Sequence, residues 1–231
     1  MFKDKNMFEN YCVIFDMDGV LADTGPIHYE SWVKLAKQIG VKFSKRFFNL
    51  TFGQQSISIT RELVGPKIKQ EVVEKWANLK ERYYREMVKD GLKPLPGALV
   101  LIKVLHARNF KLAVGSSGPP ENVDLLLSTL SIKDYFDVII TAAEVKNGKP
   151  APDVFLIAAE KLNIKVDNCL VIEDAPVGIT AARKAGMSVI ALRTTHCNID
   201  LLDADMVVQD LSYININDIL KLLDINKNNQ P

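Results

Sequence analysis

Short, nearly continuous runs of apolar residues recur along the chain, and they constrain the fold more than any other feature of the sequence. The runs cover residues 11–16, 111–116, 138–142, 169–173 and 188–192. Runs of this length and composition are typical of strands that are covered on both faces. Helical patterns at 97–109, 152–163 and 176–186 lie between most of them. Alternating strands and helices predict an α/β fold, with a parallel sheet between two layers of helices.

The first connection is too long to be a single crossover. From Asp16 to Lys111 is 111 − 16 = 95 positions, whereas a crossover needs about a dozen or more residues. The segments 27–39, 56–64 and 67–89 also have helical patterns. We therefore predict a small helical domain over residues 25–92, inserted into an α/β core formed by residues 1–24 and 93–231.

The charge balance argues against one broad class of function. The chain has 29 basic and 28 acidic residues, and its net charge of +1 gives no support to nucleic-acid binding. Its apolar runs are too short to span a bilayer, and residues 1–11 lack the apolar stretch of a secretory signal. Its three cysteines are scattered, as suits a reducing compartment. We predict a cytoplasmic protein without nucleic-acid or membrane partners, and expect a monomer, although the sequence carries no signal for the oligomeric state.

Polar side chains follow the predicted strands at the points where the strands end. Asp16 and Asp18 close the first strand, Ser116 and Ser117 the second, and Glu173 and Asp174 the fourth, while Lys149 lies in a segment after the third. Ligand sites in open parallel sheets lie beyond the carboxyl ends of the strands. The sequence therefore predicts that four carboxylates, two hydroxyls and one lysine converge on one edge of the sheet.

These residue types suit phosphoryl transfer. Neighbouring carboxylates repel one another unless a cation lies among them, and ligands that are all oxygen favour Mg²⁺. Asp16 and Asp18 project to the same side of an extended backbone, so one carboxylate could attack a substrate while the other transfers protons. Lys149 and the Ser116 hydroxyl supply the positive charge and the hydrogen-bond donors that a phosphoryl group requires.

Three other ligand-binding motifs do not fit the sequence. Gly19 is the fourth residue counted from Asp16, whereas an EF-hand loop needs glycine at its sixth position and follows a helix rather than a strand. A G-x-G-x-x-G dinucleotide loop does not occur, and Gly148-Lys149 is followed by proline instead of the Ser or Thr of a P-loop. Calcium, dinucleotide and P-loop nucleotide binding are therefore not predicted.

In its combination of motifs, the chain resembles the haloacid dehalogenase superfamily of phosphatases and phosphomutases, and within it the β-phosphoglucomutase-like subgroup with an inserted helical cap. Residues 16–20 (DMDGV) are similar to the family's first motif, Ser116 to the second, Lys149 to the third, and Glu173-Asp174 to the fourth. Each motif alone is weak evidence for the family, whereas the occurrence of all four in this order, at the ends of predicted strands, is specific for it. The resemblance covers nearly the whole chain and implies a Rossmann-like core with a helical cap.

The resemblance also implies a role for each residue. It implies that Asp16 is the nucleophile and a Mg²⁺ ligand. Asp18 would act as general acid and then as general base, and would bind the metal through its main-chain carbonyl. Asp174 would bind the metal directly, with Glu173 supporting it. The phosphoryl group would be held by Ser116 and Lys149, with Ser117 as a further candidate, beneath a cap that excludes water and selects the substrate.

Two positions in the cap extend the resemblance and one departs from it. His28 falls where several sugar-phosphate enzymes of this subgroup carry a histidine, and Lys80 falls near a cap lysine of the mutases. Both are candidate substrate-contacting residues. The mutases place a phosphate-binding arginine shortly after the glycine that corresponds to Gly53, whereas the nearest candidate here, Arg61, is displaced. This departure weighs against the second phosphate site of a mutase.

The core candidates also have purely structural interpretations. Asp16 and Asp18 could cap a turn, because Asp is favoured there. Ser116 and Ser117 could cap the helix that follows them, and this role is compatible with phosphate binding. Lys149 could be an ordinary solvated lysine.

The remaining candidates have structural interpretations as well. Glu173 could stabilise a helix N-terminus instead of binding the metal. His28 could be a surface residue of a first helical turn, and Lys80 could lay its stem over aromatic neighbours. His196 and Cys197 are too few for a zinc site, so we expect them to be loop residues.

Three functions are compatible with these residues. The one that fits best is a Mg²⁺-dependent phosphatase that hydrolyses a small phosphorylated metabolite, such as a sugar phosphate, through an aspartyl-phosphate. The second is a sugar phosphomutase of the β-phosphoglucomutase type, in which a sugar hydroxyl replaces water. The third is a non-catalytic protein that binds a phosphorylated ligand.

Overall fold

The computed structural model describes residues 8–88, 91–196 and 198–228, and its centre is a six-stranded parallel sheet. The strand order is β3-β2-β1-β4-β5-β6, so β1 lies in the middle and the order reverses beside it. The strands are β1 (Cys12–Phe15), β2 (Lys111–Gly115), β3 (Val138–Ile140), β4 (Cys169–Glu173), β5 (Ser188–Leu192) and β6 (Met206–Val208). The predicted α/β class and parallel sheet are confirmed. The three-residue β6 was not predicted.

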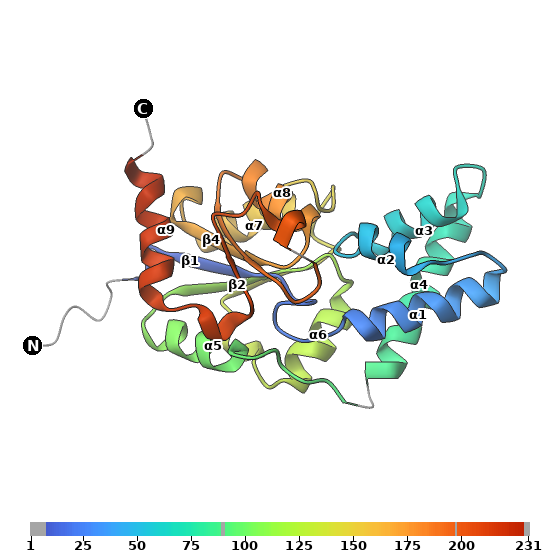
Figure 1. Ribbon diagram of the computed structural model, residues 1–231, viewed down its shortest axis with the longest axis horizontal. Coiled ribbons are helices and arrows are strands. Elements are labelled where there is room, and N and C mark those ends of the chain that lie inside the picture. The colour runs from blue at the N-terminus through green and yellow to red at the C-terminus, as the bar shows by residue number, and fades with distance from the viewer. Residues whose placement is uncertain (1–7, 89–90, 197, 229–231) are drawn as a thin grey trace, which may run out of the picture.

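Two layers of helices enclose the sheet (Figure 1). One face packs against α5 (Ala98–Ala107), α6 (Pro120–Thr129) and α9 (Ile216–Asn228), and the other against α7 (Asp153–Leu162) and α8 (Pro176–Lys184). Successive side chains of a strand point to opposite faces of the sheet, so alternate residues of β1 pack against different helical layers. Val13 and Phe15 pack against one layer, and Cys12 and Ile14 against the other. This double burial is the reason why the strands are apolar throughout.

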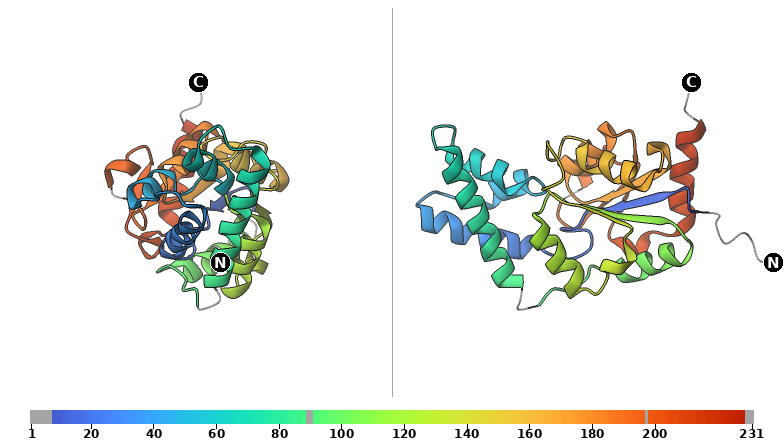
Figure 2. Two further views of the ribbon diagram at one scale, coloured as in Figure 1. Left: turned by 90° about the vertical axis from the view of Figure 1, so that its right-hand side faces the viewer. Right: turned by 180° about the vertical axis from the view of Figure 1, so that it is seen from behind.

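A helical insertion lies between β1 and β2, as the length of the first connection predicted. It comprises α1 (Gly25–Ile39), α2 (Lys45–Thr51), α3 (Ser56–Val64) and α4 (Gln70–Val88), after which α5 returns to the sheet. Figures 1 and 2 show α1–α4, here called the cap, standing at one end of the sheet. The cap has its own apolar cluster, formed by Trp32, Leu35, Phe48, Phe52 and Ile59. We propose that the cap and the core are separate domains with the boundaries predicted from the sequence.

The helices form largely where the apolar periodicity places them. The predicted segments 56–64, 67–89 and 176–186 correspond to α3, α4 and α8, and Pro176 is the first residue of α8, where a missing N–H is harmless. The short α2 was not predicted. It begins after Ser44, whose hydroxyl accepts a hydrogen bond from the Phe47 N–H. None of the helices in the described ranges is both long enough and apolar enough to cross a membrane.

Candidate active site

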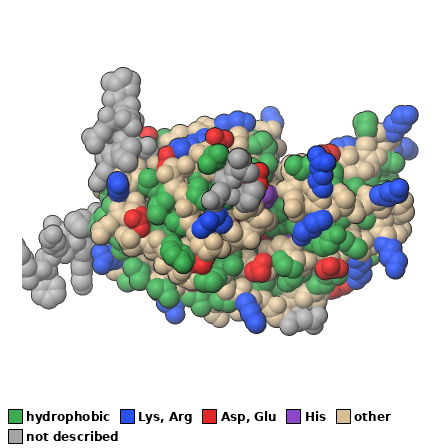
Figure 3. Space-filling view, in the orientation of Figure 1, with side chains coloured by type: hydrophobic (Ala, Val, Ile, Leu, Met, Phe, Trp, Pro, Cys, Tyr) green, Lys and Arg blue, Asp and Glu red, His purple; other side chains and the backbone are tan. Residues whose placement is uncertain are grey.

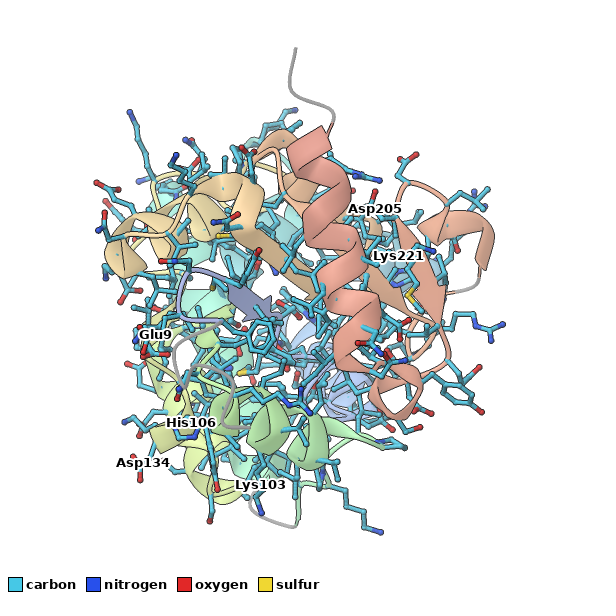
Figure 4. All side chains as sticks on the ribbon, turned by 90° about the vertical axis from the view of Figure 1, so that its left-hand side faces the viewer. Glu9, Lys103, His106, Asp134, Asp205 and Lys221 are labelled. Atoms are coloured by element: carbon cyan, nitrogen blue, oxygen red, sulfur yellow. The ribbon has the colours of Figure 1, made fainter. Side chains whose placement is uncertain are left out.

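The carboxyl ends of β1, β2 and β4 meet at the edge of the sheet that faces the cap (Figure 1). Asp16 directly follows β1, Ser116 directly follows β2, and Glu173 is the last residue of β4. These strands are neighbours and run parallel, so the residues that follow them emerge side by side. At the opposite end of the core, polar side chains such as Glu9, Lys103, His106 and Asp134 are spread around the surface (Figure 4).

Lys149 joins two of these carboxylates. Its Nζ donates to Asp16 Oδ1 and to Glu173 Oε1, at 2.6 Å in each case, and only 1% of its side chain is exposed. The interpretation of Lys149 as a solvated lysine is therefore wrong. A buried ammonium is tolerated here because two carboxylates compensate it.

Glu173 has a second set of partners in the loop that follows β4. Its Oε2 accepts hydrogen bonds from the main-chain N–H groups of Asp174, at 2.9 Å, and Ala175, at 3.1 Å. Both oxygens of Glu173 are thus engaged, one by Lys149 and the other by the start of the α8 region. Glu173 therefore fixes the position of Lys149 and of the Asp174 loop.

Asp16, Glu173 and Asp174 bring carboxylate oxygens together at a distance at which one cation can contact all three. Three such oxygens, one from each residue, lie within 4.8 Å of one another, and all three residues are buried. Asp174 Oδ2 is buried and has no hydrogen-bond partner among the described residues. Buried carboxylate oxygens without a partner are rare in proteins, and an oxygen-only set of this kind matches the ligands that Mg²⁺ prefers.

Gly19 allows the Asp174 carboxylate to lie this close to the first loop. Its φ is +79°, and a Cβ at this position would lie 2.0 Å from Asp174 Oδ2. Any residue with a side chain would therefore displace the carboxylate, in addition to being strained at this φ.

The charges of the cluster are unbalanced without a cation. Burial raises the pKa of Asp16 to about 7, with the Glu173 and Asp18 carboxylates adding to the rise and Lys149 opposing it. Burial and the same kind of carboxylate repulsion raise the pKa of Asp174 well above its ordinary range. For Lys149, burial alone would lower the pKa, but Asp16 and Glu173 raise it above the ordinary value. The site thus favours additional positive charge among its aspartates.

Asp18 lies in a different environment, on the side of the site that faces the cap. Its Oδ1 accepts from the Thr24 hydroxyl at 2.6 Å and lies 3.1 Å from His28 Nε2. Burial pushes the pKa of Asp18 up, but His28, Thr24 and Lys80 outweigh burial and bring it below the ordinary value. Asp16 and Asp18 therefore have opposite pKa shifts, which is a common arrangement for two carboxylates with different catalytic roles.

His28 and Lys80 connect Asp18 to the cap. Lys80 Nζ lies 2.6 Å from His28 Nδ1. An ammonium has no acceptor, so Nδ1 accepts and the ring carries its proton on Nε2, which donates to Asp18. The His28 ring stacks on Tyr84, with 4.0 Å between ring centroids. Both side chains are buried, so His28 is not a surface residue; Lys80 does lie over aromatic rings, those of Trp32 and Tyr84.

The two serines after β2 differ in their surroundings. Ser116 Oγ accepts a hydrogen bond from the Gly118 N–H at 3.0 Å, so this hydroxyl shapes the turn. The interpretation of these serines as helix caps is wrong, because Pro119 is the N-cap of α6 and no side chain caps this helix. Ser117 Oγ is buried and has no partner among the described residues. Ser117 also lines a cavity of about 30 Å³, and the side chains of Asp16, Asp18, His28 and Lys80 line the same cavity.

The cap closes directly over this cavity. Gly53, in the loop between α2 and α3, is so near the core that a Cβ there would lie 2.9 Å from the Ala175 Cβ. On the same side, the His196 ring lies between two main-chain oxygens, 3.0 Å from that of Asp174 and 3.0 Å from that of Asn49 in α2. His196 is a loop residue, as expected, and Cys197 lies outside the described residues. The cavity is thus enclosed by both parts of the chain.

One residue at this junction has contacts that sequence reasoning missed. Glu81 is buried in α4 and contacts both Lys80 and Ser56 in the cap, and it accepts from Asn122 Nδ2 in α6 at 2.5 Å. The only sequence signal was an acidic residue directly after Lys80, which is too common on a helix to identify a site.

Comparison with known proteins gives a consistent result. A family model described as haloacid dehalogenase-like hydrolase matches residues 13–192. Fructose-1-phosphate phosphatase YqaB from Escherichia coli is 33% identical over 81% of this chain and 99% of its own length. A phosphorylated carbohydrates phosphatase from Thermotoga maritima is 32% identical over 76% of this chain and 81% of its own.

The fold is also that of a solved structure. The crystal structure of β-phosphoglucomutase from Clostridium difficile superimposes with a TM-score of 0.86, covers 95% of this chain and 98% of its own, and is 29% identical in sequence.

Proposed function

Because this chain belongs to the haloacid dehalogenase-like hydrolase family, among the β-phosphoglucomutase-like enzymes with a helical cap, we propose that it is a magnesium-dependent phosphatase of phosphorylated carbohydrates. The observation that carries the proposal is the buried group of Asp16, Glu173 and Asp174 with Lys149 beside it. The third possibility was a protein that binds a phosphorylated ligand without catalysis. It has no support, because the family is described as hydrolases and the two relatives reported above are named as phosphatases.

Asp16, Asp174 and the main-chain carbonyl of Asp18 would hold the metal ion. Glu173 supports them indirectly, because both of its oxygens already accept hydrogen bonds from Lys149 and the loop. When bound, Mg²⁺ reduces the repulsion between the carboxylates and an incoming phosphoryl group. The orphaned Asp174 Oδ2 and the raised pKa of Asp16 fit this role.

In the first step Asp16 attacks phosphorus. Lys149 holds Asp16 Oδ1, which leaves the second oxygen of this carboxylate to form the new bond. The bond between phosphorus and the sugar oxygen breaks, and Asp18 gives its proton to that oxygen. The product is an aspartyl-phosphate on Asp16 and a free carbohydrate.

The lowered pKa of Asp18 describes the site without substrate, in which this carboxylate is ionised at neutral pH. A phosphoryl dianion entering beside it would raise that pKa, since a like charge disfavours the ionised form. Asp18 can then carry a proton for the first step. After the leaving group departs, ionised Asp18 takes a proton from water, and the resulting oxygen attacks phosphorus and breaks its bond to Asp16.

The phosphoryl group has three proposed contacts in the core. Lys149 supplies a positive charge, Ser116 supplies a hydroxyl, and the unpartnered Ser117 Oγ is a further donor. His28 and Lys80 hold Asp18 in place from the cap, which excludes bulk water when it is closed. The cytoplasmic location predicted above stays a prediction.

The test is phosphate release from a panel of sugar and polyol monophosphates with Mg²⁺ and with excess chelator. The proposal expects Mg²⁺-dependent release from at least one member of the panel. Absence of release from every member, for a folded protein with Mg²⁺, would contradict it.

A phosphomutase is the second candidate, because His28 and Lys80 meet at Asp18 and because the fold matches that of a β-phosphoglucomutase. The position of Arg61 opposes it. Arg61 donates to the main-chain oxygens of Gly65 and Ile68 and to the Gln70 side chain, so it closes the loop between α3 and α4. An assay with β-glucose 1-phosphate and a catalytic amount of the bisphosphate separates the two candidates: isomerisation without free phosphate would identify a mutase.

A further inference from the structure

A second, larger cavity adjoins the small one between Asp16 and the cap. It measures about 360 Å³, and the two cavities share Ser56, Glu81 and Ser117 as a common wall. The small cavity, at about 30 Å³, has room for little more than a water molecule. A carbohydrate whose phosphorus lies beside Asp16 does not fit within this volume, and the larger cavity is the space next to it.

The lining of the larger cavity is polar and acidic. It consists of the carboxylates of Glu74 and Glu81, the amides of Gln55 and Asn78, the hydroxyls of Ser56 and Ser117, and a few apolar groups. Carboxylates and amides can accept hydrogen bonds from hydroxyl groups, and amides and hydroxyls can also donate them. A chain or ring that carries several hydroxyls matches this lining.

Positive charge is scarce around both cavities. Figure 3 shows Lys and Arg side chains over the outer end of the cap, whereas Lys80 is the one lysine or arginine among the described residues that line either cavity. Lys80 is already paired: its Nζ lies 3.1 Å from Glu81 Oε1 and 2.6 Å from His28 Nδ1. It has no charge to spare for a second anionic group of the substrate.

Glu81 is held in the shared wall as an ionised group. Its Oε1 accepts from Ser56 and Lys80, and its Oε2 accepts from Asn122, which in turn accepts from Arg85 at 2.8 Å. Burial would raise the pKa of Glu81, but Lys80, His28 and Ser56 bring it below the ordinary value. This network holds the Glu81 carboxylate ionised, paired with Lys80, in the wall that the two cavities share.

We infer that the larger cavity binds an uncharged, hydroxyl-bearing leaving group and that Glu81 is a specificity-determining residue, which makes the enzyme reject substrates with a second phosphate. A second phosphate would lie beside the carboxylates of Glu74 and Glu81, and no lysine or arginine among the described residues that line this cavity would balance its charge. A neutral polyol would instead use the remaining acceptor capacity of the Glu81 carboxylate. The inference rests on the proposed phosphatase function.

The test compares fructose 1-phosphate with fructose 1,6-bisphosphate, which differ only in the second phosphate. For the unmodified protein we expect kcat/KM to be at least about tenfold higher for the monophosphate. Glu81→Gln keeps the size of the side chain and removes its charge, so it should narrow this ratio by at least about threefold. Glu81→Asp, which keeps the charge, should preserve the preference for the monophosphate. Glu86→Gln, on the exposed side of the same helix, should leave both rates unchanged.

Each outcome of the comparison decides a different claim. Equal or higher kcat/KM for the bisphosphate in the unmodified protein would overturn the inference while leaving a phosphatase. An unchanged ratio in a folded Glu81→Gln variant would overturn the role of Glu81. If neither fructose phosphate nor any other sugar monophosphate releases phosphate, the proposed function itself fails. The ratio of kcat/KM between the two fructose phosphates can be measured on the unmodified protein alone, so the inference is tested even if the Glu81→Gln variant misfolds.

Discussion

The core and the cap contribute to the site by different means. In the core, Asp16, Ser116 and Glu173 are placed by the backbone, because three neighbouring parallel strands end at one edge. In the cap, His28 and Lys80 are 52 residues apart in the chain, on two different helices, and meet only through tertiary packing. The positions of the functional side chains of the core therefore follow from the topology of the sheet. The positions of those in the cap depend on which face of each helix points toward the site.

The buried face of α4 illustrates the difference. The buried residues of this helix include the apolar Val73 and Ala77 together with Lys80 and Glu81. A buried charged pair on a helix is stable only when partners compensate it, here His28, Ser56 and Asn122. The buried face of α4 therefore contributes both to the apolar packing of the cap and to the polar contacts of the site.

Replacing the core nucleophile should have the largest effect. Asp16→Asn keeps the size of the side chain but cannot attack phosphorus, so we expect kcat to fall by at least about 10⁴-fold in a phosphate-release assay. Asp134→Asn, at the far end of the core, is the matched control and should change nothing (Figure 4). Turnover near the original rate in Asp16→Asn would remove the basis for placing the chemistry in the core.

The second aspartate should matter less. Asp18→Asn removes proton transfer and leaves the nucleophile in place, so kcat should fall about 10²- to 10⁴-fold. The fall should be smaller for substrates with an acidic leaving group, such as an aryl phosphate, because these need no proton in the first step. The exposed Asp23→Asn serves as the control. An equal loss for both types of leaving group would argue against a role for Asp18 as general acid.

The contribution of the cap can be separated by changing His28. His28→Gln keeps a hydrogen-bonding group but loses the stacking on Tyr84 and the fixed connection to Lys80, so kcat should fall about tenfold to a hundredfold with little change in KM. His106→Gln, an exposed histidine of the core, should be neutral. A change in KM alone would show that the cap binds substrate without positioning Asp18.

Metal binding should depend on pH through the core. Burial raises the pKa of Asp16 to about 7 in the metal-free site, so below that pH a proton must leave before Mg²⁺ can bind. The apparent affinity should rise with pH across the range around 7, with at least about tenfold weaker binding at pH 6 than at pH 8, because Asp174, whose pKa is also raised, must lose its proton as well. Calorimetric titration of the protein without substrate measures this, and a pH-independent affinity would contradict the account.

Arg61 should affect the stability of the cap and not the reaction. Arg61→Ala removes three hydrogen bonds that close the loop between α3 and α4, so we expect the free energy of unfolding to fall by about 1 kcal/mol. Activity on a sugar monophosphate should stay within about twofold. Thermal unfolding and a phosphate assay check the two expectations, and a large loss of activity with unchanged stability would favour a phosphate-binding arginine.

Much of the fold could be predicted from the sequence, for reasons that the structure makes clear. The strands were recognisable because both of their faces are buried, and the insertion because the first connection was too long. The family resemblance is confirmed by the match over residues 13–192. The elements that were not predicted are β6, α2, α6 and α9, and of these β6 and α2 are too short to carry much periodicity.

The site could be predicted only in part. The structure brings Asp16, Asp18, Lys149, Glu173 and Asp174 together at the strand ends, although their catalytic roles stay predictions. Glu81 could not be found from the sequence, because its partner Asn122 is 41 residues away, in a helix of the core that was not predicted. Contacts between the cap and the core depend on packing that residue spacing does not encode.

The most direct test of the account is to look for the phosphoryl group on the protein itself. The enzyme would be quenched with acid during turnover of a sugar monophosphate, and its peptides analysed by mass spectrometry. We predict an acid-stable phosphoryl group on the peptide that contains Asp16, formed only with Mg²⁺ and absent from the Asp16→Asn variant. Rapid phosphate release with no phosphorylated peptide, or with the phosphoryl group on another residue, would contradict the assignment of Asp16 as the nucleophile.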